Sequence, residues 1–155
     1  MKKFLFDCGT RDATASLGIL VLRVGIGLLM LLGHGVGKIQ TFAEKKDVFP
    51  VPDFLPLNLM SNPVSLMATI GAEVGCSALI ILGLATRPAA FIFAFTMVVA
   101  AFNIHATGPW FMAGGPGSKE PALLFLIPAI AILLTGAGQY SFDAALHKEG
   151  RRKKW

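Results

Sequence analysis

Residues 16–38, SLGILVLRVGIGLLMLLGHGVGK, form a stretch that is long and apolar enough to cross a bilayer. Arg23 lies inside this stretch, and His34 and Lys38 lie at its far end. At roughly 100° per residue, Arg23 and His34 return to within about 20° of each other on a helix, so one face is polar. An arginine at the bilayer centre costs about 2.5 to 3.5 kcal/mol on insertion scales. We therefore expect Arg23 to face protein and to have a partner there.

Three further apolar stretches follow, and the composition excludes an ordinary soluble domain. The chain of 155 residues is 54% hydrophobic and 15% charged, whereas soluble domains carry about 25% charged residues. The four apolar stretches are residues 16–36, 64–84, 88–107 and 121–136. The sequence therefore predicts an all-α fold, an integral membrane four-helix bundle. Residues 1–15 are expected to form an N-terminal arm and residues 137–155 a basic tail.

The distribution of basic residues predicts the orientation. Nine of them lie in the N-terminal arm, at Arg87 and in the tail, whereas the two connections on the other side hold four. Because cytoplasmic loops carry the excess of Lys and Arg, both termini are expected in the cytoplasm. Anionic lipid headgroups are the expected partner of this basic face. Nucleic acid is not expected, because no binding module surrounds the basic tail.

The second stretch carries Glu73 near its middle, which makes it the natural partner of Arg23. A rise of about 1.5 Å per residue puts Arg23 about 10 Å and Glu73 about 16 Å from the cytoplasmic edge. Consecutive spans are commonly neighbours, so the sequence predicts that the two side chains pair. Two interpretations stay open. The pair fixes the register of the two helices, or Glu73 is a proton-accepting carboxylate tuned by Arg23.

Small residues flank the polar positions. Gly71 and Gly75 form a GxxxG pattern around Glu73, and Gly33 and Gly37 form another around His34. Glycines with this spacing let two helix backbones approach closely in a membrane. We expect close helix contacts at these four glycines.

A second polar group is predicted near the outer edge of the bundle. The helix rise puts His34 and His105 both at about 26 Å from the cytoplasmic side. Lys38, Asn103 and Glu120 lie within a turn or so of that level. Such a group suits a polar headgroup such as a quinone carbonyl, or a proton relay.

The candidate site residues follow from these two groups. Glu73, His34 and His105 are the candidates for catalysis, and Arg23, Lys38, Asn103 and Glu120 are the candidates for substrate binding. Asn103 and His105 are about 200° apart on a helix, so both cannot face one pocket of an ideal helix.

No metal or haem is expected, although two histidines at matched depth are the arrangement that a bis-histidine haem needs. No carboxylate follows at ligand spacing. Cys8 and Cys76 are too separated for a disulfide framework and lack metal-site spacing, so reduced thiols are expected.

The long connection at residues 39–63 combines prolines with phenylalanines and leucines. It is either a cap on the bundle at the lipid headgroups or a lid over an outward-facing pocket.

An ordered set of motifs resembles the DoxX family of small bacterial membrane proteins. These are HGVGK at residues 34–38, GLATR at 83–87, the KEPALL segment that begins the fourth stretch, and YSFD at 140–143. The resemblance implies a four-helix bundle in the bacterial cytoplasmic membrane. For some relatives it implies quinone-linked redox systems, including a subunit of thiosulfate:quinone oxidoreductase.

Two hypotheses of function follow. The chain is a subunit of, or accessory to, a quinone-linked membrane oxidoreductase, with quinone as a non-covalent ligand. Alternatively, it is a non-catalytic structural or assembly subunit of a larger membrane complex. Other membrane subunits or further copies of the chain are the expected protein partners in either case.

Overall fold

The computed structural model describes residues 9–10, 12–114 and 117–146, and within these residues all regular structure is helical. Three helices are long and apolar enough to cross a membrane: Ala13–Gln40, Asn62–Leu82 and Thr86–Ile104. The fourth apolar helix, Glu120–Thr135, is shorter. The first helix extends several residues further at both ends than expected, whereas each of the other three begins one or two residues earlier and ends one to three residues earlier than the predicted stretch. Much of the predicted arm and tail lies outside the described residues.

Each of the three long helices contains one π-helical segment. The first consists of α2 (Ala13–Met30), the π-helical η1 (Leu31–Gly35) and α3 (Val36–Gln40). The second consists of α5 (Asn62–Ile70), the π-helical η3 (Gly71–Cys76) and α6 (Ser77–Leu82). The third consists of α7 (Thr86–Val99) and the π-helical η4 (Ala100–Ile104), and α8 (Glu120–Thr135) is α-helical throughout.

Short elements lie in the two connections at the outer ends of the helices, taken as the ends where α3 and η4 finish. The first connection holds α4 (Phe42–Lys45) and the 3-10 helix η2 (Leu57–Leu59). The second holds the 3-10 helix η5 (Met112–Gly114).

Local sequence explains where the helices begin and turn. The Asp12 side chain accepts a hydrogen bond from the backbone N–H of Ala15 at 2.7 Å, which caps the start of α2. Gly83 ends α6 at φ 69°, a left-handed conformation that glycine adopts at little cost. Ala85 follows at φ 46°, so the turn into α7 is strained.

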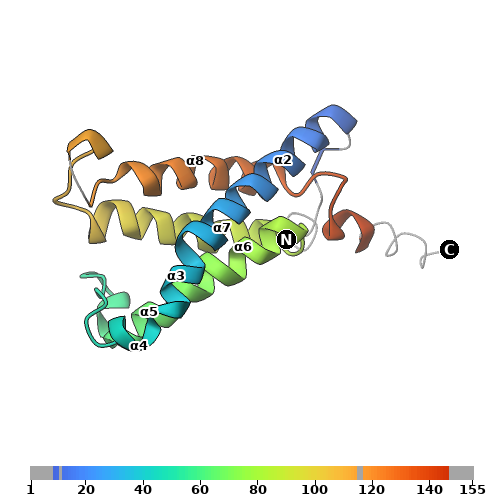
Figure 1. Cartoon of the computed structure of the whole chain (residues 1–155). Helices are drawn as coiled ribbons and strands as arrows, with labels where there is room; N and C mark the ends of the chain where they lie inside the picture. Colours follow the sequence, from blue (N-terminus) through green and yellow to red (C-terminus); the bar gives the residue numbers. More distant parts are fainter. Residues whose placement is uncertain (1–8, 11, 115–116, 147–155) are drawn as a thin grey trace.

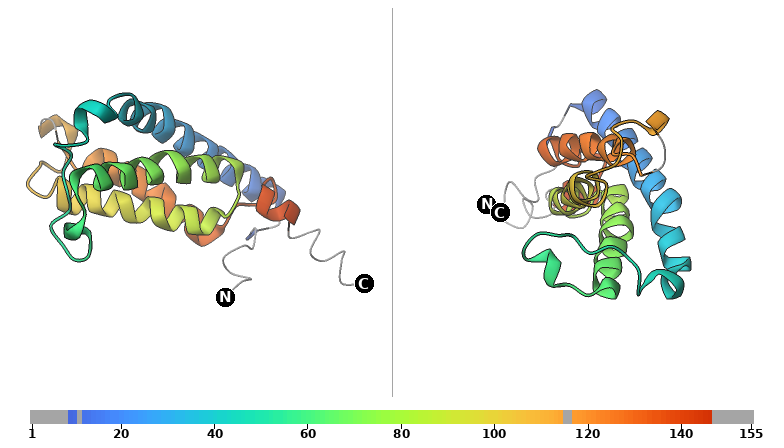
Figure 2. Two further views of the ribbon diagram at one scale, coloured as in Figure 1. Left: turned by 90° about the horizontal axis from the view of Figure 1, so that it is seen from below. Right: turned by 90° about the vertical axis from the view of Figure 1, so that its left-hand side faces the viewer.

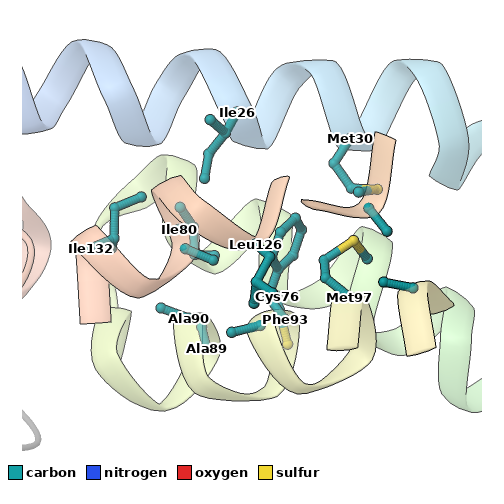
Figure 3. Packing of buried hydrophobic residues seen from close by; sticks show 14 residues of the cluster. Ile26, Met30, Cys76, Ile80, Ala89, Ala90, Phe93, Met97, Leu126 and Ile132 are labelled. Atoms are coloured by element: carbon teal, nitrogen blue, oxygen red, sulfur yellow. The ribbon is translucent and has the colours of Figure 1, made fainter. Parts of the chain in front are cut away.

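The helices pack as two hairpins that diverge at their outer ends. α2 packs on α6, and α7 packs on α8. Figures 1 and 2 show α2 crossing α8 near the start of α2 and then running away from it toward α4. The core lies where all helices meet and contains Met30, Phe93, Leu126 and Ile132 (Figure 3).

Close backbone approach occurs at glycines other than the predicted ones. A Cβ added at Gly27 would lie 2.5 Å from Cγ1 of Ile81, and one added at Gly35 would lie 2.7 Å from Cγ2 of Val74. By contrast, a Cβ added at any of the four GxxxG glycines would meet nothing within 4 Å: Gly33, Gly37, Gly71 and Gly75. The prediction of close contacts at those four positions is wrong within this chain, because the motifs face outward.

Candidate functional site

A cavity of about 690 Å³ lies between the two hairpins at their outer ends. Most of its lining side chains are apolar, among them Met30, Met97, Ala122 and Phe125. Its polar side chains come from the first three helices, the residue after η4 and the second connection: His34, Lys38, Ser65, Thr69, Glu73, Thr96, His105 and Ser118. A largely apolar cavity with a few convergent polar groups is the usual form of a small-molecule site.

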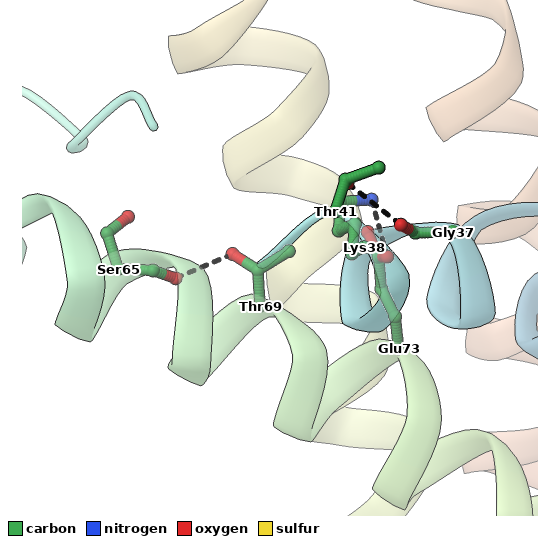
Figure 4. A network of polar contacts seen from close by, with 6 residues as sticks. All are labelled: Gly37, Lys38, Thr41, Ser65, Thr69 and Glu73. Atoms are coloured by element: carbon green, nitrogen blue, oxygen red, sulfur yellow. Dashed lines mark hydrogen bonds and ion pairs between the residues drawn. The ribbon is translucent and has the colours of Figure 1, made fainter. Parts of the chain in front are cut away.

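An ion pair stands in the cavity wall. Lys38 Nζ donates to Glu73 Oε2 at 2.6 Å, and the side chains are 22% and 8% exposed. Figure 4 shows the two side chains meeting from α3 and η3, with Thr69 one turn further along. The wall therefore offers a donor and an acceptor at one place.

The prediction that Arg23 pairs with Glu73 is wrong. Arg23 is 2% exposed, and its guanidinium donates to the backbone carbonyls of Ile80 at 3.1 Å, Ile81 at 2.5 Å and Tyr140. Arg23 thus ties α2 to the end of α6 and to the segment after α8, at the opposite end of the molecule from the cavity.

The direction of helical side chains explains this result. Side chains lean toward the N-terminal end of their own helix, so Arg23 on α2 leans away from the outer end, where the cavity lies. Glu73 belongs to an antiparallel helix and leans toward the outer end, where Lys38 leans back to meet it. Depths counted from the helix rise compare backbone positions only and do not include these opposite directions.

Both predicted histidines line the cavity. His34 is exposed and lies in η1, and its ring meets the ring of Phe125 edge-on, with centroids 5.6 Å apart. His105 follows η4, and its backbone N–H donates to the carbonyl of Ala100. The two histidines that the sequence places at one depth therefore both line the same cavity, from different elements.

Asn103 holds a loop and does not line the cavity. Its Oδ1 accepts from the backbone N–H of Asp53 at 3.1 Å. This agrees with the expectation that Asn103 and His105 face different ways. We call residues 47–60 the strap, because they run from α4 past α5 to η4 (Figure 2).

The strap supplies part of the cavity wall through Phe49, Pro50 and Pro52. Asn62 donates to the carbonyl of Phe49, and Ser65 donates to that of Pro50, both at 2.8 Å. The strap is therefore more than a cap at the headgroups, because it closes one side of the pocket.

Glu120 lies at the start of α8 outside the cavity lining, where its Oε2 accepts from the backbone N–H of Met112 at 2.6 Å. Its neighbour Lys119 is 6% exposed and donates to the carbonyls of Ala106 and Gly108 at 2.8 and 2.6 Å. Substrate binding by Arg23, Asn103 and Glu120 stays a prediction, and each has a structural contact elsewhere.

Two residues with clear structural roles were not singled out from the sequence. One is Lys119, which gathers the carbonyls of the second outer connection. The other is Asp143, whose carboxylate accepts from the backbone N–H groups of Ala85 and Thr86 at 2.8 and 3.0 Å. The only signal for Asp143 was its place in the YSFD motif, which said nothing of its contact.

The three π-helical segments lie around the cavity. His34 belongs to η1, Glu73 to η3 and Ala100 to η4, and all three line it. A π-turn shifts the register of the side chains that follow it, and such turns occur frequently at functional sites. Helical-wheel geometry with about 3.6 residues per turn cannot foresee this shift.

No cluster of three or more His, Cys, Asp and Glu side chains suited to a metal ion occurs among the residues that the structure describes. Cys76 is a buried free thiol, and Cys8 lies outside the described residues.

The chain is similar to two proteins of Haemophilus influenzae that are described as uncharacterized. One is 30% identical over 74% of this chain and 72% of its own length. The other is 33% identical over 83% of this chain and 90% of its own length. No solved structure matches significantly. The DoxX family model matches residues 18–106, more than half of the 155-residue chain. Together with its apolar helices, this match shows that the chain is a membrane protein of the DoxX family.

Proposed function

We propose that this chain binds a lipid-soluble quinone in its outer cavity and serves as a subunit of, or accessory to, a quinone-linked oxidoreductase of the bacterial cytoplasmic membrane. The observation that carries the proposal is the Lys38–Glu73 pair, which stands in the wall of a cavity that is otherwise largely apolar. Such a cavity favours a ligand with an apolar body and a polar head.

The polar side chains fit a quinone headgroup. Lys38 offers hydrogen-bond donors to a carbonyl oxygen, and Glu73 offers an acceptor to a hydroxyl. A quinone supplies two-electron redox chemistry with uptake of two protons when it is reduced to the quinol. His34 and His105 on the cavity walls are suited to exchange protons with that head. The electrons would come from a partner subunit.

The proposed placement is a four-helix bundle with both termini in the cytoplasm. Side chains that point out of the helices are large and apolar, as contact with lipid tails requires: Val21 at 67% exposed, Leu29 at 65%, Phe91 at 60% and Ile127 at 67%. The basic residues of the termini then meet anionic headgroups. The cavity lies at the opposite, outer end.

The test is to purify the chain in mild detergent and to measure extracted quinone by chromatography. The unchanged protein should retain quinone, whereas Glu73→Gln and His34→Ala should each retain several-fold less. The first change removes the negative charge that pairs with Lys38, and the second removes a polar side chain from the cavity wall. Glu44→Gln, whose side chain is exposed on α4, is the control and should retain as much as the unchanged protein. Equal, background levels of quinone in all four proteins would overturn the proposal.

A structural or assembly role is the alternative, and one observation favours it. The outward-facing glycines of the two GxxxG motifs leave open space beside η1, α3 and η3, and such motifs commonly receive a second helix in membranes. The partner would be another membrane subunit or a second copy of the chain. Gly71→Ile should then reduce co-purification of that partner without reducing quinone content.

A further inference from the structure

Connecting segments and helices both form the cavity wall. At the outer end of the helices, connecting segments form the wall. Pro52 of the strap and Ser118 of the second connection line the cavity and are buried, whereas Pro50 and Met112 of the same segments line it and are exposed. Ser65 and Lys119 donate hydrogen bonds to backbone carbonyls of these segments, and Asn103 accepts one from the strap.

The first helix and α8 also supply residues that line the cavity. Figure 1 shows the two helices crossing and then separating toward the outer end, where η1 and α3 run away from α8. The cavity-lining residues on the two sides of this gap are His34 of η1 and Phe125 of α8, whose rings touch edge-on. His34 both lines the cavity and is exposed at the surface of the molecule. His34, which we call the rim together with Phe125, is therefore part of both the cavity wall and the outer surface.

The outer surface next to this rim is apolar. Leu32 of η1 is 66% exposed and Leu124 of α8 is 60% exposed, and each lies within two residues of the rim. In the proposed membrane placement these side chains contact acyl chains. The rim thus joins the cavity to a lipid-facing surface, whereas the outer end meets water.

We propose that the cavity opens sideways into the bilayer beside the contact between His34 and Phe125, and that its ligand is an amphiphile dissolved in the membrane. The polar head lies against the Lys38–Glu73 pair, and the apolar tail leaves between α2 and α8. This inference rests on the proposed membrane placement and extends the proposed function, because it assigns the route and the amphiphilic character of the ligand. It does not depend on the head being a quinone.

The test measures access to the cavity with thiol reagents and needs no ligand. The probe is Met97→Cys, which replaces a side chain that lines the cavity and is 3% exposed. It is placed in a chain carrying Cys8→Ser and Cys76→Ala and reconstituted into lipid vesicles. N-phenylmaleimide, which partitions into the bilayer, should label the probe at least about tenfold faster than a sulfonated maleimide confined to water.

Narrowing the rim should slow the membrane-soluble reagent. His34→Trp and Phe125→Trp each enlarge a side chain at the rim and should reduce labelling by N-phenylmaleimide several-fold. Leu32→Trp, on the lipid-facing side of the same π-helical segment, is the matched control and should leave the rate unchanged. A cysteine at Ile127, which is 67% exposed on α8, reports reagent concentration in the bilayer and should react equally in all variants.

Two results would overturn the sideways opening. One is labelling of Met97→Cys by the sulfonated reagent as fast as by N-phenylmaleimide. The other is an unchanged rate in both tryptophan variants at the rim. Quinone retention is measured separately, so a chain that passes the access test but retains no quinone would refute the proposed function alone. A chain that retains quinone but fails the access test would refute the opening alone.

Discussion

The Lys38–Glu73 ion pair and the buried Arg23 form two separate polar groups, at opposite ends of the molecule. Lys38 and Glu73 satisfy each other beside the cavity, at a distance of 2.6 Å. Arg23 gives its donors to backbone carbonyls of α6 and of the segment after α8. A guanidinium is suited to this task because its planar fork presents several donors at once. The outer polar group is therefore free of Arg23, and the two groups should behave independently.

A double-mutant cycle tests that independence. Lys38→Met and Glu73→Gln should each lower the free energy of unfolding by about 1.5 to 3 kcal/mol, because each leaves a partly buried charged side chain without the opposite charge beside it. The double variant should lose at least about 0.5 kcal/mol less than the sum. The measurement is unfolding by denaturing detergent.

The control cycle combines Arg23→Met with Glu73→Gln. These residues share no contact, so their effects should add within about 0.5 kcal/mol. Coupling in this cycle and additivity for Lys38 with Glu73 would restore the pairing that the sequence alone predicts.

At this scale the sequence identified the polar residues better than their partners. His34, Lys38, Glu73 and His105 all line the cavity, because their depths follow from counting along helices. The partner of Arg23 was missed, since the direction of a side chain along its helix decides which carbonyl or carboxylate it reaches. Lys119 bonds to carbonyls 11 and 13 residues away and Asp143 to N–H groups 57 and 58 residues away, and periodicity carries no information about such contacts.

At the scale of helices, glycines decide how closely α2 approaches α6. Gly27→Ala should destabilise the protein by about 1 to 3 kcal/mol, because the added Cβ would lie 2.5 Å from Cγ1 of Ile81 and 3.2 Å from the carbonyl of Ser77. Gly25→Ala is the matched control on the same helix, where the added Cβ meets nothing within 4 Å. It should be neutral or stabilising by up to about 1 kcal/mol. Thermal unfolding in detergent measures both, and equal shifts in Tm would contradict the described packing.

The turn between α6 and α7 depends on a carboxylate from the far end of the chain. Asp143 accepts from the backbone N–H groups of Ala85 and Thr86 and so caps the start of α7. Asp143→Ala should cost about 1 to 2 kcal/mol of stability, a typical value for loss of a cap. Asp143→Asn keeps one acceptor oxygen and should cost less.

Thermal unfolding of these two variants should be compared with that of Asp47→Ala, whose side chain is exposed at the start of the strap. A Tm for Asp143→Ala as high as that of Asp47→Ala would show that the cap contributes nothing.

Helix positions were predictable because long apolar stretches leave few alternatives in a chain with 54% hydrophobic residues. The π-helical turns and the path of the strap were not. A π-turn adds a residue to one turn without a clear mark in the sequence. The strap is held by three side chains, Asn62, Ser65 and Asn103, that bond to its backbone and not to recognisable side-chain partners.

At the scale of the whole molecule, we propose that the two diverging hairpins enclose a site for a membrane-dissolved quinone. The most direct measurement is photolabelling with a quinone that carries a photoreactive group on its ring, followed by mapping of the labelled peptides by mass spectrometry. We expect labels on cavity residues such as Met30, Met97 and Phe125. Excess unlabelled quinone should suppress this labelling. Labels confined to lipid-facing residues such as Leu29 and Ile127, and unaffected by the competitor, would contradict it.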